Sequence, residues 1–118
     1  MKKEPLIFLK HILKEVNKIE ESTKDLSKEG FKKDVNIQDA TIRRIEIIGE
    51  AAKNLPKSFK DKHKNKKIPW IDITDTRNKL IHHYFGVDLD ITWEIAKVHV
   101  PDLKKKIKAI VEEESKEK

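Results

Sequence analysis

The sequence contains no cysteine and no long apolar run. Without cysteine the chain can form neither disulfide bridges nor thiolate metal sites, and an intracellular protein is the simplest expectation. The longest apolar run, Leu6 to Leu9, has four residues and is soon followed by charge. Neither a membrane-spanning helix nor a signal peptide is therefore expected, and the composition favours a cytoplasmic protein.

Arginine and tyrosine are also scarce. Of the 27 basic residues only Arg43, Arg44 and Arg77 are arginines, and Tyr84 is the only tyrosine. Lysine therefore serves wherever a plain positive charge is enough. Arg77 is expected to be present for its planar guanidinium group, which can bind two oxygens of a phosphate at once.

Charge, by contrast, is abundant: 41% of the residues are charged and the formal net charge is +6. A basic surface attracts polyanions, so the partner is expected to be nucleic acid or an acidic protein. The 118 residues suffice for one core and show no repeat or strand pattern. We expect residues 1–118 to form a single domain.

In the first part of the chain the apolar residues recur at helical spacing. Pro5 suits a first helical turn, and the pattern from Leu6 to Ile19 predicts an amphipathic helix that runs to about Lys28. Gly30 is expected to end this helix, and a loop should continue to Val35.

A second helix is predicted from a cap at Asn36 to Pro56, with a buried stripe of Ile45, Ile48, Ala52 and Leu55. Gly49 lies inside this stripe. Because a glycine within a helix costs about 1 kcal/mol relative to alanine, it predicts that another helix approaches closely there.

The rest of the chain predicts two more helices. Residues 57–67 form a basic loop or short helix, and Pro69-Trp70 opens a third helix that ends at Gly86. A last helix should run from Asp90 to Glu113 with a kink at Pro101, followed by a frayed tail over residues 112–118. The sequence thus predicts an all-α antiparallel bundle of four helices, or five if the kink breaks the last one.

One short segment of the third helix carries the residues with chemical potential. Arg77 can bind a phosphate, His82 can exchange a proton near neutral pH, and Tyr84 offers a hydroxyl. On a regular helix Arg77 lies about 140° from His82, whereas Asn78 lies about 40° from it. Arg77 must therefore reach around the helix, the helix must unwind near Gly86, or a second subunit must complete the site.

The pattern Arg77-x4-His82-x-Tyr84 occurs in register with three other blocks. Ile68-Pro69-Trp70 and the run from Arg44 to Ala51 precede it, and Gly86-Val87-Asp88 with Trp93 follows it. Together they resemble the HepT-like family of the HEPN superfamily, from about Ile37 to Leu103.

The resemblance implies an all-helical homodimer that cleaves RNA without metal at a cleft between its subunits. It also implies a toxin that is paired with a minimal nucleotidyltransferase antitoxin, and it makes Tyr84 the target of adenylylation by that partner. In such a site Arg77 would clamp the phosphate, His82 would act as general base or acid, and Asn78 would orient His82 or the phosphate. The product would carry a 2′,3′-cyclic phosphate or its hydrolysed form.

Lysines near these residues are candidates for RNA contact, namely Lys79 and the basic-segment residues Lys62, Lys64, Lys66 and Lys67. No cofactor is expected. A metal site is not expected either, because His82 and His83 diverge on a helix, no H-E-x-x-H pattern occurs, and no carboxylate lies between Arg77 and Tyr84.

Structural roles compete with these chemical ones. Arg77 could serve only to pair with Glu46 or Glu50, Tyr84 could pack in the core, and the two tryptophans fit a core or an interface better than base stacking. The alternative function is a non-catalytic helical dimer that binds nucleotide or the nucleotidyltransferase. The presence of Arg77, His82 and Tyr84 together favours the ribonuclease.

Overall fold

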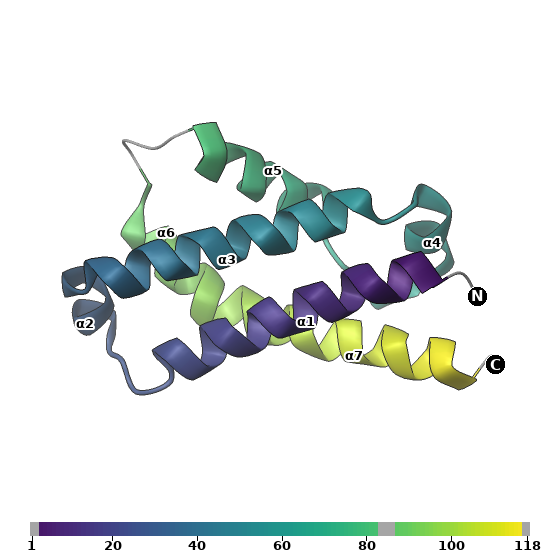
Figure 1. Ribbon diagram of the computed structural model, residues 1–118, viewed down its shortest axis with the longest axis horizontal. Coiled ribbons are helices and arrows are strands. Elements are labelled where there is room, and N and C mark those ends of the chain that lie inside the picture. The colour runs from purple at the N-terminus through teal and green to yellow at the C-terminus, as the bar shows by residue number, and fades with distance from the viewer. Residues whose placement is uncertain (1–2, 83–86, 117–118) are drawn as a thin grey trace.

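Helices make up the fold of the computed structural model, which describes residues 3–82 and 87–116, and no strand occurs among these residues. The four long helices are α1 (Lys3–Thr23), α3 (Val35–Asn54), α5 (Trp70–His82) and α7 (Val100–Lys116). Figure 1 shows consecutive long helices running in opposite directions, with α1 against α3 and α7, and α5 against α3. The predicted all-α bundle is confirmed, whereas the homodimer stays a prediction.

The core lies where the apolar stripes of α1, α3 and α7 meet. These stripes follow the three-and-four spacing of an amphipathic helix, and the buried residues include the four predicted for the second helix. The core comprises Leu9, Ile12, Val16 and Ile19 of α1, Ile45, Ile48, Ala51, Ala52 and Leu55 at or just after α3, and Val100, Leu103, Ile107 and Ile110 of α7.

The first helix ends at Thr23 rather than near Lys28, so its predicted length was wrong. The Thr23 hydroxyl is buried and donates to the Ile19 carbonyl at 2.8 Å. By bonding back to the preceding turn, this hydroxyl finds a hydrogen-bond partner although it is shielded from water.

A short helix, α2 (Lys28–Lys33), occupies the segment that was predicted to be a loop. The Ser27 hydroxyl caps it by accepting from the Gly30 amide at 3.0 Å, so Gly30 lies inside a helix and does not end one. Phe31 is fully buried, with its ring centroid 5.3 Å from that of Trp93. This tertiary contact stabilises α2, although a segment that contains glycine has only a weak preference for the helical conformation.

The second long helix, α3, begins earlier than predicted. Its cap is Asp34, whose Oδ1 accepts from the Ile37 amide at 3.0 Å, and the predicted cap Asn36 lies in the first turn. Both residue types suit an N-cap. Asp34 takes the position because its amide also donates to the Phe31 carbonyl at 3.2 Å, which joins α2 to α3 directly.

The basic segment contains the short helix α4 (Lys57–Lys62) and the 3₁₀ turn η1 (Lys64–Lys66), so the short-helix alternative is confirmed. Helix α5 begins at Trp70, as the Pro69-Trp70 pair predicted. Its predicted end at Gly86 lies outside the described residues.

The last helical stretch is not one regular helix. It consists of α6 (Leu89–Glu94), the π-helical segment η2 (Ile95–His99) and α7. Pro101 has no N–H to donate to the Lys97 carbonyl, and the wider turn lies directly before it, where the Val100 amide donates to the Ile95 carbonyl five residues back. The predicted disturbance at Pro101 therefore takes the form of a π-helical segment.

In the part of the chain that is described, no helix is both long enough and apolar enough to cross a membrane.

Candidate active site

Arg77 lies on the face of α5 that packs against α3, with 21% of its side chain exposed. Its Nη2 forms an ion pair with Glu50 Oε2 at 2.7 Å, and its Nη1 donates to Asn78 Oδ1 at 2.8 Å. Its Nε is buried and has no hydrogen-bond partner among the described residues. The pairing with Glu50 is one of the structural roles that the sequence left open.

Glu50 is itself held in place by the last turn of α3. The Asn54 side-chain amide donates to the Glu50 backbone carbonyl at 2.9 Å and lies 3.5 Å from Glu50 Oε1. One carboxylate oxygen therefore faces Asn54 and the other faces Arg77. Asn54 therefore orients the Glu50 carboxylate that binds the guanidinium group of Arg77.

Gly49 explains how Arg77 comes so close to α3. A Cβ atom at Gly49 would lie 2.2 Å from the Cβ of Arg77 and 3.2 Å from the carbonyl oxygen of Ile73. Only glycine allows the two helix backbones to approach this closely. The close helix approach that Gly49 predicted is confirmed, and it brings Arg77 to the acidic side chain next in sequence.

The structure describes the other residues of the motif less completely than Arg77. His82 is the last residue of α5, and Tyr84 lies outside the described residues. Asn78 accepts a hydrogen bond from Arg77, a contact that the sequence did not predict. The convergence of Arg77 and His82 on one phosphate, and the modification of Tyr84, stay predictions.

A cavity of about 350 Å³ opens beside Arg77, between α1, α3 and α5. It is lined by two aromatic rings, charged groups of both signs and a few apolar side chains. We call it the Arg77 cavity; its residues are Phe8, His11, Arg43, Glu46, Ile47, Glu50, Ala51, Asn54 and Arg77. Among the described residues, no group of three or more His, Asp or Glu side chains is arranged to hold a metal ion.

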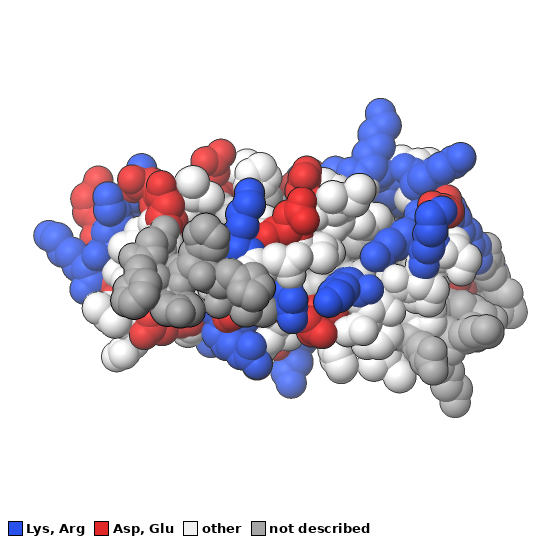
Figure 2. Space-filling view, turned by 90° about the horizontal axis from the view of Figure 1, so that it is seen from above, with Lys and Arg blue, Asp and Glu red and all other residues white. Residues whose placement is uncertain are grey.

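The candidate RNA-binding lysines fall into two groups. Lys62 pairs with Glu114 at 2.9 Å and Lys66 pairs with Glu113. Lys64, Lys67 and Lys79 are exposed, and their side chains form no ion pair within the described ranges. Figure 2 shows basic side chains gathered over the end of the molecule that holds α4. That end therefore keeps a positive surface although two of its lysines are engaged.

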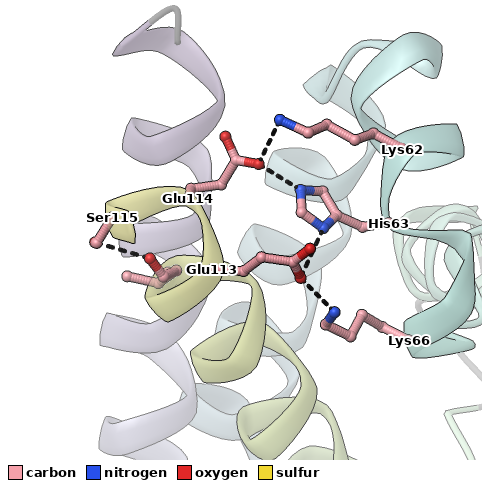
Figure 3. Close-up of polar contacts among 7 residues, drawn as sticks. Lys62, His63, Lys66, Glu113, Glu114 and Ser115 are labelled. Atoms are coloured by element: carbon pink, nitrogen blue, oxygen red, sulfur yellow. Dashed lines mark hydrogen bonds and ion pairs between the residues drawn. The ribbon is translucent and has the colours of Figure 1, made fainter. Parts of the chain in front are cut away.

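A buried polar cluster, which the sequence analysis missed, joins the basic segment to the end of α7 (Figure 3). His63 Nε2 lies 2.7 Å from Glu114 Oε2, and both side chains are at most 1% exposed. His63 Nδ1 lies 3.7 Å from Glu113 Oε2, and the ring packs on Phe59 with 4.8 Å between ring centroids. The predicted frayed tail is therefore wrong as far as Lys116, because Glu114 is anchored inside the fold.

The two carboxylates of this cluster are stabilised in their charged form. For Glu114, burial alone would raise the pKa, but the hydrogen bonds from Lys62 and His63 together with the positive charges of these two residues outweigh burial and lower the pKa. For Glu113, the hydrogen bond from Lys66 lowers the pKa. The signal in the sequence was Glu114 itself, which continues the apolar stripe that runs through Ile110 and so requires a buried partner.

The comparison with known families matches residues 12–110 to a family model described as Ribonuclease HepT-like. The chain belongs to the HepT-like ribonuclease family. The match covers α3, α5 and parts of α1 and α7, and it includes the Arg77 to Tyr84 segment. It confirms the predicted family and the predicted enzyme class, a ribonuclease.

This HepT-like chain has curated relatives in several organisms. It is 49% identical over its whole length to "Gamma-glutamylcyclotransferase and putative RNase MJ0434" of Methanocaldococcus jannaschii, of which it covers 52%. It is 46% identical over 95% of its length to "Putative RNase TTE0752" of Caldanaerobacter subterraneus, and 42% identical over 93% to "Probable ribonuclease HepT" of Thermococcus cleftensis, covering 98% of each. The chain thus spans about half of the first relative and nearly all of the other two. No solved structure matches it significantly.

Proposed function

We propose that this HepT-like protein is a metal-independent endoribonuclease in which Arg77 and His82 act on one RNA phosphate. The observation that carries the proposal is the setting of Arg77. Its guanidinium group is held between Glu50 and Asn78, five residues before His82 on the same helix, and it borders an open cavity. A partly exposed arginine at a cavity is suited to an anionic ligand.

Cleavage of RNA without metal needs a base, an acid and a positive charge at the phosphate. One imidazole removes the proton of the ribose 2′-OH, and the resulting oxygen attacks the adjacent phosphorus. The bond to the 5′ oxygen breaks, and a second acid returns a proton to that oxygen. Arg77 offsets the charge that builds up on the phosphate, so the products are a 2′,3′-cyclic phosphate and a free 5′-OH.

The phosphate has to take the place of Glu50 at the guanidinium group. The Glu50 side chain is 49% exposed, so its ion pair with Arg77 is weak enough to exchange. A phosphate can use the same edge of the guanidinium group and forms stronger, bidentate hydrogen bonds. Glu50 thus holds Arg77 in position until RNA arrives.

A homodimer completes this mechanism. On a regular helix Arg77 and His82 point about 140° apart, so the His82 of a second subunit is the natural source of the other proton-transferring group. We expect the protein to act in the cytoplasm as a toxin. Its partner would be a minimal nucleotidyltransferase antitoxin that adds AMP to Tyr84, because a phosphodiester beside Arg77 would compete with the RNA phosphate.

The test is cleavage of total RNA by the purified protein in EDTA, with mapping of the new ends. His82→Ala should abolish cleavage, and Arg77→Lys should impair it severely because lysine lacks the two-pronged donor. His99→Ala is the matched control, since His99 is an exposed histidine on η2 and should leave cleavage unchanged. Undiminished cleavage by His82→Ala would contradict the proposed mechanism.

The antitoxin step is tested separately. The nucleotidyltransferase and ATP should add one AMP to the wild-type chain and none to Tyr84→Phe, as read by intact-mass and peptide mass spectrometry. Tyr84→Phe should still cleave RNA but escape inactivation. If the wild-type chain is switched off without gaining a nucleotide, the partner acts by covering the site.

A second function remains, a non-catalytic helical dimer that binds nucleotide or the nucleotidyltransferase. The pairing of Arg77 with Glu50 and Asn78 fits this function as well, because a purely structural arginine would be paired in the same way. A wild-type protein that binds the partner but cleaves no RNA would support this function.

A further inference from the structure

The Arg77 cavity contains groups that the proposed chemistry does not use. One of them is Arg43, which is exposed and forms no hydrogen bond or ion pair within the described part of the chain. Its neighbour Arg44 instead donates to the Ser22 hydroxyl at 3.0 Å. Two of the chain's three arginines therefore line one cavity, and one of these two is free to bind a ligand.

Arg43 and the Glu50 that pairs with Arg77 stand at different positions along α3. Glu50, which pairs with Arg77, lies seven residues after Arg43 on α3, and seven residues of helix extend about 10 Å. This distance exceeds the width of one phosphate group. A strand that carries a phosphate on each nucleotide can reach both arginines.

The cavity also offers surfaces for a base. Phe8 and His11 lie one turn apart on α1, with ring centroids 6.4 Å apart and ring planes at 83°. A planar base can stack on one ring and meet the other ring edge-on. Glu46 supplies a carboxylate on the α3 side of the same cavity, and carboxylates accept hydrogen bonds from the amino groups of bases.

We propose that the Arg77 cavity is a subsite for one nucleotide of single-stranded RNA, next to the phosphate that Arg77 binds. Arg43 binds the neighbouring phosphate, Phe8 and His11 receive the base, and Glu46 favours a base with an amino group on its exposed edge. The inference rests on the proposed function, because it assigns Arg77 to the phosphate that is cleaved. It adds an affinity site and a source of base preference outside the Arg77-x4-His82 motif.

The experiment measures binding and cleavage side by side. Binding uses a labelled single-stranded RNA with 2′-O-methyl ribose, which the proposed chemistry cannot cleave, and is followed by fluorescence anisotropy over a range of salt concentrations. Arg43→Ala should weaken binding about tenfold, and the slope of log K against log salt should fall by about 0.7, as expected for one lost phosphate contact on a single strand. In cleavage the effect should fall on KM rather than on kcat.

Arg44→Ala is the matched control. It removes the same charge at the next position, but its guanidinium group is bonded to Ser22 rather than to the cavity. It should change RNA binding less than about twofold and leave the salt slope unchanged. Phe8→Leu keeps the apolar volume and removes the ring, so it should weaken binding without changing the salt slope. Glu46→Gln should change the preference among oligomers of the four bases more than the average affinity.

The outcomes separate this proposal from the proposed function. If the wild-type protein cleaves RNA but Arg43→Ala and Arg44→Ala bind alike, the subsite is wrong and the ribonuclease stands. If the wild-type protein cleaves nothing yet Arg43→Ala loses binding and salt slope, the subsite stands and the cleavage proposal fails. If Arg43→Ala changes the sedimentation of the protein instead of its RNA affinity, the cavity belongs to a protein interface and the subsite is overturned.

Discussion

Replacing Gly49 by alanine tests whether the contact between α3 and α5 sets the position of Arg77. The new methyl group would lie 2.2 Å from the Cβ and 2.8 Å from the Cγ of Arg77. Carbon atoms in contact normally lie about 3.5 to 4 Å apart. The Cβ of Arg77 is fixed to its backbone, so a rotamer change cannot relieve the overlap. The two helices must separate locally by more than 1 Å, to a first approximation.

Two opposing terms decide the size of the effect. Alanine stabilises a helix interior by about 1 kcal/mol relative to glycine. Forcing extra volume into a packed contact typically costs about 1 to 3 kcal/mol, and a clash with backbone-linked atoms belongs at the upper end. We expect Gly49→Ala to lower the free energy of unfolding by about 1 to 2 kcal/mol. It should also move Arg77 away from Glu50 and reduce cleavage more than tenfold.

Urea unfolding followed by circular dichroism gives the stability, and RNA cleavage gives the activity. Gly30→Ala is the control, because Gly30 also lies inside a helix but a Cβ there would meet only side-chain atoms, at 3.3 Å and 3.6 Å. It should change stability by less than about 1 kcal/mol. If Gly49→Ala is as stable and as active as the wild type, the close contact does not position Arg77.

Three further predictions address the ion pair, the buried cluster and the helix cap. Glu50→Gln should tighten RNA binding about two- to fivefold in anisotropy measurements, because the phosphate no longer displaces a carboxylate; weaker binding would mean that Glu50 orients Arg77 for RNA. The pKa of Glu114 is lowered in the folded protein, so its carboxylate stabilises the fold above its ordinary pKa of 4.5, and this stability is lost as the pH falls through the lower folded pKa. Urea midpoints should therefore fall less steeply below about pH 4.5 in Glu114→Gln than in the wild type, and an unchanged pH profile would contradict this assignment. Asp34→Ala should cost about 1 kcal/mol in urea unfolding and Asn36→Ala much less, since Asp34 makes the cap hydrogen bond; equal costs would contradict the observed cap.

Patterns with a short range along the chain predicted most of the helices. Apolar residues three and four apart predicted the buried stripes of α1, α3 and α7, and Pro69-Trp70 predicted the start of α5. Gly49 predicted a close approach by another helix, although not that Arg77 would be the residue in contact. The predictions failed where a short helix depended on a distant contact, as α2 depends on Phe31 and Trp93.

In the candidate site, too, some features follow from the sequence and others from the tertiary structure. The sequence by itself determined the Arg77-x4-His82-x-Tyr84 pattern and with it the family, because a motif is a property of neighbours along the chain. Only the tertiary structure decided that Arg77 pairs with Glu50 rather than Glu46, and that His63 meets Glu114 across 51 positions of sequence. It also decided that Arg44 is bonded to Ser22 while Arg43 has no partner among the described residues. Such contacts depend on how closely and at what rotation the helices pack. Helix periodicity determines which face of a helix is buried, but the packing of one helix on another determines which atoms meet.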